Sequence, residues 1–263
     1  MIKFSIIINT HNQSKYIHHA INSCLKQTYK NYEILIIDSS PQRINLVKSL
    51  NSKKKIEYVH IKSPHKHPEI NQMKKIIKGY EQSTGDYILF LDGDDFFHKK
   101  KLSELNTLII ERKIICNQDL PILFKNSKKK TMLKKNYKNK FFTKYLLNNW
   151  PQIYGTSSIT IKKDFLKRYL NNANPLNWKY LAIDAQLILF CARHKIQSNY
   201  LEDCTFKRLH DKNLGSSYMN IFKKIFWSRR HMQFEYSEYI KYNNNFSIDY
   251  FVTKLIYLII KYF

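Results

Sequence analysis

The first forty residues alternate short apolar runs with an amphipathic stretch. Apolar, β-branched residues fill Phe4–Ile8, and the polar residues 9–12 end that run. Between residues 16 and 26 the apolar side chains recur at spacings of three and four, which predicts a helix with one buried stripe. A second apolar run, Glu33–Ile37, stops at Asp38. Because strand–helix–strand crossovers are right-handed, the two strands should lie parallel.

The same alternation continues toward residue 100. Residues 55–61 favour a third strand, 73–82 a helix and Tyr87–Leu91 a fourth strand. This pattern predicts an α/β fold, in which ligands bind beyond the carboxyl ends of the strands. Three polar segments follow predicted strands directly: Thr10–Asn12, Asp38 and Asp92–Asp95. We therefore expect them to meet at one crevice.

The second half of the chain is less regular. Lysine and asparagine dominate 125–144, which favours a basic excursion from the core. Residues 157–161 predict another strand, and 184–194 predict a helix with one apolar side. Beyond Tyr218 aromatic residues alternate with cations, which indicates a separate C-terminal extension.

Composition adds a strong positive charge. Lys and Arg number 45 against 20 Asp and Glu, a formal net charge of +25 that attracts nucleic acid, an anionic membrane surface or phosphorylated substrates. A merely solvated lysine-rich surface is the plainer alternative. The last 14 residues are mostly apolar but contain Lys254 and Lys261. A spanning helix needs about 20 apolar residues, so we expect this end to lie on a membrane or pack on the domain.

The cysteines and the N-terminus bear on the compartment. Four widely spaced cysteines form no C-x-x-C pair, and Met1 leads into the first strand without a basic leader or a long apolar stretch. We expect a reducing, cytoplasmic location.

Asp92 and Asp94 form the clearest chemical motif. At a strand end, residues two apart point the same way, so their carboxylates can hold a hard cation. Mg²⁺ or Mn²⁺ bound by one or two carboxylates keeps positions free for phosphate oxygens and can neutralise a departing diphosphate. Gly93 permits a close backbone approach to the ligand. The alternative is an acidic turn that caps the next helix.

The order and spacing of three blocks resemble the family 2 glycosyltransferases, inverting enzymes with the GT-A fold. The blocks are Ser5–Asn12, Gln27–Asp38 and Gly85–Asp95. The resemblance implies a mostly parallel twisted sheet flanked by helices, with a Rossmann-like nucleotide-binding half. It implies a transferase domain over 1–217 (donor half 1–100, acceptor half 101–217) and a helical extension over 218–263.

The resemblance also assigns the donor site. It implies that Thr10 and His11, beside Asn12, border the nucleotide base, that Asp38 reads the base edge and that Asp92 contacts the ribose. Asp94 would hold Mn²⁺ or Mg²⁺. The family's usual donor is a UDP-sugar, and the expected acceptor is a hydroxyl of a surface polysaccharide, glycan or lipid-linked glycan.

Some positions depart from the family pattern. Asn9 replaces the usual proline, His11 the usual tyrosine, and Ser39 and Ser40 follow Asp38 in place of aspartate and glycine. The expected Ala-Arg-Asn segment reads Lys75-Ile76-Ile77, so Lys75 or Lys74 could supply the missing cation. A solvent-facing lysine is the alternative.

Three later positions complete the expected site. Asp184 resembles the family's catalytic base, which takes the acceptor proton, with Asp203 as the substitute candidate. His210, in Phe206-Lys207-Arg208-Leu209-His210, resembles the late histidine that reaches the metal or the diphosphate. Trp178, like Trp150 and Tyr154, could stack on an acceptor sugar, although such aromatics more often belong to the core.

Two other classes of protein compete with the transferase. Lysines interleaved with aromatics suit a nucleic-acid-binding protein, but strand-end carboxylates repel a polyanion unless they hold a metal, and we expect no nucleic-acid partner. The missing family residues and the basic-aromatic tail would also suit a membrane-surface scaffold with a degenerate active site. For an active enzyme, the same tail predicts peripheral attachment to an anionic, cytoplasmic membrane face.

Overall fold

The structure is a computed structural model, and it describes residues 1–44, 55–62, 65–125, 128–131, 150–196, 201–210, 220–242 and 247–262. Its main sheet has the strand order β3-β2-β1-β4-β9-β6. The strands are β1 (Phe4–Thr10), β2 (Tyr32–Asp38), β3 (Ile56–His60), β4 (Tyr87–Asp92), β6 (Cys116–Gln118) and β9 (Ile159–Lys162). Strands β3, β2, β1 and β4 run parallel, and β9 pairs antiparallel with both β4 and β6. The predicted mostly parallel sheet is confirmed.

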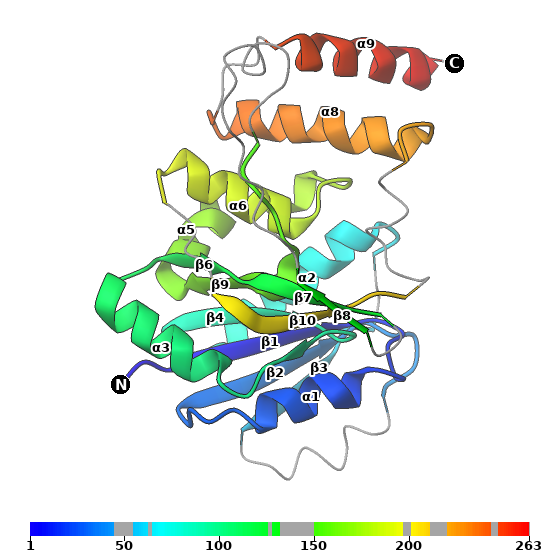
Figure 1. Cartoon of the computed structure of the whole chain (residues 1–263). Helices are drawn as coiled ribbons and strands as arrows, with labels where there is room; N and C mark the ends of the chain where they lie inside the picture. The colour runs from blue at the N-terminus through cyan, green and yellow to red at the C-terminus, as the bar shows by residue number, and fades with distance from the viewer. Residues whose placement is uncertain are drawn as a thin grey trace.

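Helices cover both faces of this sheet (Figure 1). They are α1 (Ile17–Leu25), α2 (Pro68–Gln82), α3 (Lys101–Arg112), α5 (Lys163–Asn172), α6 (Ile183–Arg193), α8 (Lys224–Tyr239) and α9 (Ile248–Tyr262). Figure 1 shows α1 and α3 below the sheet, α2, α5 and α6 above it, and α8 and α9 stacked beyond α6. Helix α2 begins at Pro68, five residues before the predicted start, because proline suits a first helical turn.

A second, smaller sheet was not predicted from the sequence. It has the order β5-β10-β7-β8, with β5 (Phe96–Phe97), β7 (Leu120–Lys125), β8 (Lys128–Thr131) and β10 (Glu202–Arg208). Strand β5 directly follows the acidic turn of residues 92–95 and pairs with β10. Residues more than a hundred positions apart therefore meet beside that turn.

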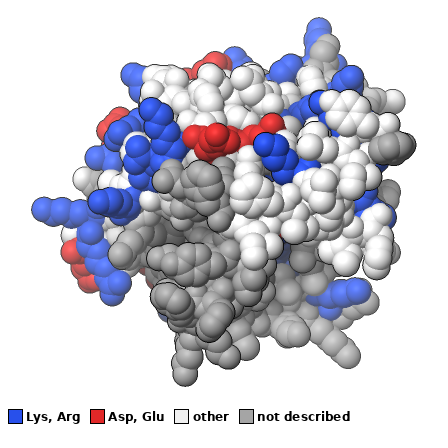
Figure 2. Space-filling model, turned by 90° about the horizontal axis from the view of Figure 1, so that it is seen from above, with Lys and Arg blue, Asp and Glu red and all other residues white. Residues whose placement is uncertain are grey.

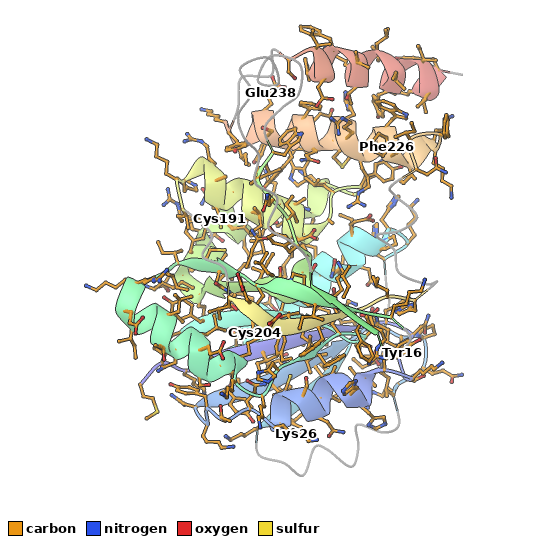
Figure 3. All side chains as sticks on the ribbon, in the orientation of Figure 1. Tyr16, Lys26, Cys191, Cys204, Phe226 and Glu238 are labelled. Carbon is orange, nitrogen blue, oxygen red and sulfur yellow. The ribbon has the colours of Figure 1, made fainter. Side chains whose placement is uncertain are left out.

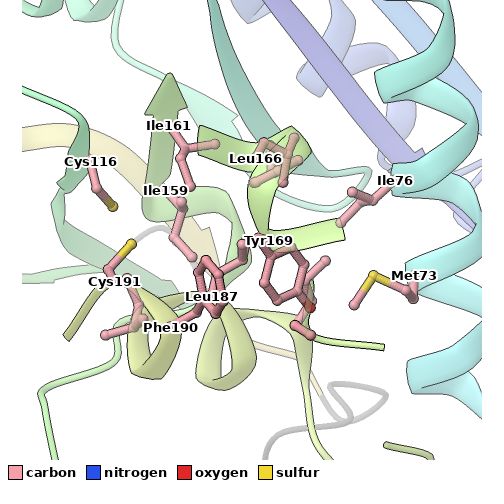
Figure 4. Close-up of a cluster of buried hydrophobic side chains, with 14 of the residues drawn as sticks. Met73, Ile76, Cys116, Ile159, Ile161, Leu166, Tyr169, Leu187, Phe190 and Cys191 are labelled. Carbon is pink, nitrogen blue, oxygen red and sulfur yellow. The ribbon is translucent and has the colours of Figure 1, made fainter. Parts of the chain in front are cut away.

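Successive side chains of a strand point to opposite faces of the main sheet, so the hydrophobic core has one part on each face. In β1, Phe4, Ile6 and Ile8 pack on the side of α1 and α3, whereas Ile7 packs on the side of α2. Figure 4 shows the second cluster, in which Met73 and Ile76 of α2 lie near Tyr169 and Leu187. A Cβ at Gly79 would come within 2.7 Å of the Ile7 side chain, so glycine lets α2 approach β1. The predicted strand at 157–161 is displaced, because residues 156–158 form a 3-10 turn before β9.

Helix α8, the first of the two helices after residue 217, shares the main core. Tyr236 is fully buried, its hydroxyl donates to the Gln186 carbonyl over 3.0 Å, and Ile240 joins the same hydrophobic cluster. The boundary at 217 stays a prediction. All four cysteines are buried and free, and Figure 3 shows Cys191 on α6 and Cys204 on β10.

Among the helices within the described residues, none has both the length and the apolar character needed to cross a bilayer.

Candidate active site

The carboxylates of Asp92 and Asp94 lie at the end of β4, beside β1. Asp92 pairs in register with Asn9, and its Oδ1 accepts a 3.0 Å hydrogen bond from Gln72 Nε2 of α2. Burial, and then the neighbouring charge of Asp94, raise the pKa of Asp92 to about 6. The two carboxylates are thus close enough to repel each other, a cost that a bound cation would remove.

Asp94 also meets the predicted histidine. His210 Nε2 donates to Asp94 Oδ2 over 2.8 Å, and the imidazole stacks on the Tyr16 ring at 5.0 Å. Tyr16 precedes α1, at the right-hand end of the sheet in Figure 3. The structure therefore brings Asp94 and His210 together from positions 116 residues apart.

This donor set fits Mn²⁺ or Mg²⁺. Carboxylate oxygens suit both ions, which commonly complete their coordination with water and phosphate oxygens, and the softer imidazole ligand favours Mn²⁺ over Mg²⁺. Within the described ranges, no group of three His, Cys, Asp or Glu side chains could hold a metal ion. A cation at Asp94 and His210 would therefore need ligands from the nucleotide or from water.

Asp95 anchors the acidic turn to the smaller sheet. Its Oδ1 accepts the Arg208 backbone N–H over 2.8 Å, and its Oδ2 accepts the Ser157 hydroxyl over 2.7 Å. Arg208 Nε donates to the Asp94 carbonyl over 3.0 Å. Burial, and next the charges of Asp94 and Asp92, raise the pKa of Asp95 well above its ordinary value. The hydrogen bonds from Arg208 of β10 and from Ser157, just before β9, thus fix the position of the acidic turn.

The sequence did not identify Gln72, Ser157 and Arg208 as parts of the site, and it assigned Asp95 no role of its own beyond membership of the acidic turn. A signal existed for Arg208, which lies two residues before His210 in the segment that resembles the family. Gln72 precedes Lys75 by three residues, which places both on one side of a helix. Only the fold brings Ser157 to Asp92, whose backbone N–H donates to the serine hydroxyl over 3.0 Å.

Lys75 is a buried cation beneath the strand ends. Only 5% of it is exposed, and its Nζ donates to the Thr10 carbonyl over 3.0 Å. Burial lowers the pKa of Lys75 to about 8, although the nearby charges of Asp92, Asp38 and Asp94 oppose that shift. The solvent-facing alternative is therefore wrong for Lys75, whereas Lys74 is exposed.

Asp38 is fully buried at the end of β2. Its Oδ1 accepts from the Ser40 backbone and hydroxyl over 2.8 and 2.6 Å, and its Oδ2 accepts the Tyr58 hydroxyl over 2.8 Å. The carboxylate thus shapes the loop after β2. A contact of Asp38 with the nucleotide base stays a prediction.

The loop after β1 carries the other predicted donor residues. His11 Nδ1 lies 2.8 Å from the Ser39 carbonyl oxygen, and the Asn12 backbone N–H donates to the Ser40 hydroxyl over 2.8 Å. Asn12 has a φ of 55°, in the left-handed region that asparagine tolerates. Thr10 is buried, and its hydroxyl has no hydrogen-bond partner among the described residues. A pocket of about 530 Å³ opens beside these loops, lined by Asn12, Ser14, Ser40, Pro41, Gln42, Arg43 and Ile44.

A side chain at Gly93 would displace its neighbours. A Cβ at this position would come within 2.6 Å of Gln13 Oε1 and 2.9 Å of Thr10 Oγ1. The glycine therefore lets the acidic turn lie close to the loop after β1. The donor residues predicted in these two segments are thereby brought together.

Asp184 lies in the first turn of α6, partly exposed. Its Oδ1 accepts the Ala185 backbone N–H over 2.9 Å, and its charge contributes to the raised pKa of Asp92. Asp184 is therefore in the electrostatic reach of the acidic turn. The substitute candidate, Asp203, is exposed near the start of β10, five residues before Arg208.

The aromatic candidates for acceptor binding have core contacts. Trp178 Nε1 donates to the Ala173 carbonyl over 2.9 Å, and its ring packs against Tyr236 and Tyr239 at 5.1 and 5.4 Å. Trp150 packs edge-on against Phe234 of α8 at 5.1 Å. A role for Trp178 toward an acceptor stays a prediction. Of the basic segment 125–144, the stretches 126–127 and 132–144 lie outside the described residues.

A mostly parallel sheet with helices on both faces, whose strand ends carry this acidic turn, a buried lysine and a facing histidine, is typical of a GT-A-type glycosyltransferase. The model of "Glycosyl transferase family 2" matches residues 5–170. The chain belongs to this family, and it is a glycosyltransferase.

Relatives and solved structures agree with that assignment. The amylovoran biosynthesis glycosyltransferase AmsB of Erwinia amylovora is 27% identical over 203 residues, which cover 69% of this chain and 67% of AmsB. An uncharacterized glycosyltransferase of Rickettsia felis is 40% identical over 102 residues, which cover 38% of this chain and only 16% of that protein.

Two of the solved structures that share this fold contain a bound nucleotide-sugar. Staphylococcus aureus TarS 1-349 in complex with UDP-GlcNAc has a TM-score of 0.64 at 16% identity, covering 99% of this chain and 72% of TarS 1-349. The mannosyltransferase PcManGT from Pyrobaculum calidifontis, in complex with GDP-Man and Mn²⁺, has a TM-score of 0.58 at 11% identity, covering 92% of this chain and 65% of PcManGT. The α/β, GT-A-type expectation is thereby confirmed.

Proposed function

We propose that this protein is a metal-dependent inverting transferase that moves a sugar from a UDP-sugar to an acceptor hydroxyl in polysaccharide or glycan assembly. The observation that carries the proposal is the meeting of Asp92, Asp94 and His210 at one strand end. UDP-GlcNAc bound to TarS and the polysaccharide named for AmsB support this choice of donor and pathway class. The assembled site favours an active enzyme over a degenerate scaffold.

The proposed donor site uses charges from three segments. Asp94 and His210 would hold Mn²⁺ or Mg²⁺, which when bound neutralises the negative charge of the departing diphosphate. Lys75 supplies a second, buried positive charge 3.0 Å from the Thr10 carbonyl. The pocket beside Asn12 and Ser40 would receive the base, and Asp92 the ribose.

The proposed attack by the acceptor hydroxyl needs one catalytic base. Asp184 takes the proton from the acceptor hydroxyl as that oxygen attacks the anomeric carbon. The bond to the diphosphate breaks on the opposite face of the sugar, so the configuration inverts. The partly exposed position of Asp184 in the first turn of α6 leaves its carboxylate open to an acceptor.

The donor is tested by thermal shift with UDP, GDP, CDP and dTDP, each with and without Mn²⁺. Saturating UDP with Mn²⁺ should raise Tm by roughly 5–10 °C, because a ligand that binds only the native state stabilises it. EDTA should abolish the shift. A Tm shift of the same size without metal would contradict metal-dependent binding. A larger Tm shift with GDP than with UDP would show that the donor carries guanine in place of uracil.

Lys75→Met should weaken UDP binding by about tenfold or more, since it removes a buried charge close to the site of the diphosphate. Lys74→Met is the matched control, because the neighbouring lysine is exposed. Calorimetric titration of both variants with UDP and Mn²⁺ measures the effect. Equal affinities of the two variants would show that Lys75 has only a structural role.

The proposed acceptor is a glycan or a lipid-linked glycan at an anionic membrane surface, met from the cytoplasmic side. The net charge of +25 and the basic-aromatic residues 218–263 support such a partner, because cations concentrate at anionic headgroups.

A further inference from the structure

Helix α9 presents an uninterrupted apolar stripe to solvent. Its members recur at three- and four-residue spacing, and each is 40–73% exposed: Ile248, Phe251, Val252, Leu255, Leu258, Ile259 and Tyr262. At 100° per residue these seven positions span about 120° of the helix surface. We call them the outer stripe. Soluble helices normally turn such a stripe toward the core, so its exposure calls for a partner.

The opposite side of α9 fixes this orientation. Arg230 of α8 binds the Asp249 carboxylate with two nitrogens, with Nε and one terminal nitrogen 2.9 and 2.6 Å from Oδ1. Thr253 is fully buried, and Tyr257 stacks on His231 of α8 at 4.0 Å. Polar and aromatic contacts therefore hold α9 on α8, beside which it lies in Figure 1, and the residues of the outer stripe stay exposed.

Positive charge borders the outer stripe. Lys254 and Lys261 are exposed and, at 100° per residue, fall on the same flank of α9. Just before α8, Ile221 and Phe222 are 52% and 91% exposed and precede Lys223. Seen from above, uncharged side chains cover much of the right half of the molecule, with Lys and Arg around them and a group of Asp and Glu at their edge near the upper centre (Figure 2).

We propose that the outer stripe of α9 binds an anionic lipid surface, with the helix lying in the plane of the headgroups and its flanking lysines on phosphate groups. A wide apolar face with cations beside it is the pattern of interfacial helices. The 15 residues of α9 are too few to span a bilayer. The inference rests on the membrane partner proposed above, and it does not depend on the transfer reaction.

Charge favours lipid over a second copy of the chain. Two copies joined through this stripe would bring together proteins that each carry a formal charge of +25, with Lys254 and Lys261 beside the contact. Like charges at an interface oppose association, whereas anionic headgroups attract the same lysines.

The test is cosedimentation of the full chain with phosphatidylcholine vesicles, either pure or containing about one third phosphatidylglycerol. The wild type should bind the anionic vesicles, more weakly at high salt. The double variant Leu255→Asp/Ile259→Asp should bind roughly tenfold more weakly or worse, because it places charges in the inserted face. Ile110→Asp is the matched control, since Ile110 on α3 is 64% exposed and lies outside the stripe.

Three outcomes would overturn the proposal. They are no vesicle binding by the wild type, equal binding by the double variant, and wild-type dimers that the double variant converts to monomers without any lipid binding. Light scattering after gel filtration measures the last of these. The shift of Tm by UDP and Mn²⁺ should persist in the double variant, which checks its folding and separates a failed membrane proposal from a failed donor site.

Discussion

Asp94→Ala should lower kcat/KM for sugar transfer by roughly a hundredfold or more and abolish the stabilisation by UDP with Mn²⁺. The variant removes the carboxylate that His210 contacts at 2.8 Å, and with it a proposed cation ligand. The change should also lower the pKa of Asp92, because the charge of Asp94 helps to raise it. Activity assays, calorimetry with UDP and Mn²⁺, and carboxyl NMR measure the three effects.

Two further variants separate the function of Asp94 from its packing. Asp94→Asn keeps the volume and an acceptor for His210 but loses the charge, so it should be nearly as inactive as the alanine variant. Asp164→Ala removes an exposed carboxylate in the first turn of α5 and should leave activity unchanged. If Asp94→Ala still bound UDP in a metal-dependent way, Asp94 would not be the cation ligand.

Asp94→Ala should not lower the Tm of the free protein. Asp92, Asp94 and Asp95 crowd three carboxylates into one turn, and their mutual charges contribute to the raised pKa values of Asp92 and Asp95. Removing one charge relieves that repulsion, which offsets the lost bond to His210. A large drop in Tm would instead indicate that Asp94 is mainly structural.

Asp184→Asn should lower kcat by roughly 10²–10⁴-fold while leaving the UDP-dependent shift of Tm intact. Asparagine keeps an oxygen for the Ala185 backbone N–H, which Asp184 now bonds at 2.9 Å, but it cannot take the acceptor proton. Steady-state kinetics with a saturating donor measure the change in kcat.

Asp203→Asn is the control for Asp184→Asn. Asp203 has a φ of 57°, a left-handed conformation that asparagine also adopts, so the substitution should not disturb β10. Its activity should equal that of the wild type. If the loss of kcat occurred in Asp203→Asn and not in Asp184→Asn, the roles of the two residues would be exchanged.

Local pattern predicted the donor half of the fold well. The predicted strands Glu33–Ile37 and Tyr87–Leu91, and the helical spacing between residues 16 and 26, match β2, β4 and α1 within one residue at each end. Strand and helix periodicity are properties of consecutive residues, so one sequence contains them. Parallel pairing then places the strand ends at one edge, which is why the acidic turn and the residues after β1 were predicted together.

Contacts between distant residues lay beyond such patterns. The pairing of β5 with β10 brings Arg208 to Asp95 across 113 positions, and the lone Ser157 reaches both Asp92 and Asp95. The periodicity of the sequence does not predict these contacts of Arg208 and Ser157, because they depend on how the two sheets pack together. Lys75 is a similar case, since helical spacing gives its side of α2 but not the depth at which it is buried.

The last helix shows the same division. The sequence by itself determined that residues 250–263 are mostly apolar and are interrupted by Lys254 and Lys261. It left open whether the apolar side of this helix packs on the domain or faces solvent, because a helical pattern does not say which neighbouring element covers it. Only the tertiary structure decided this, since Arg230 and His231 of α8 bind the other side of α9 and leave the outer stripe exposed.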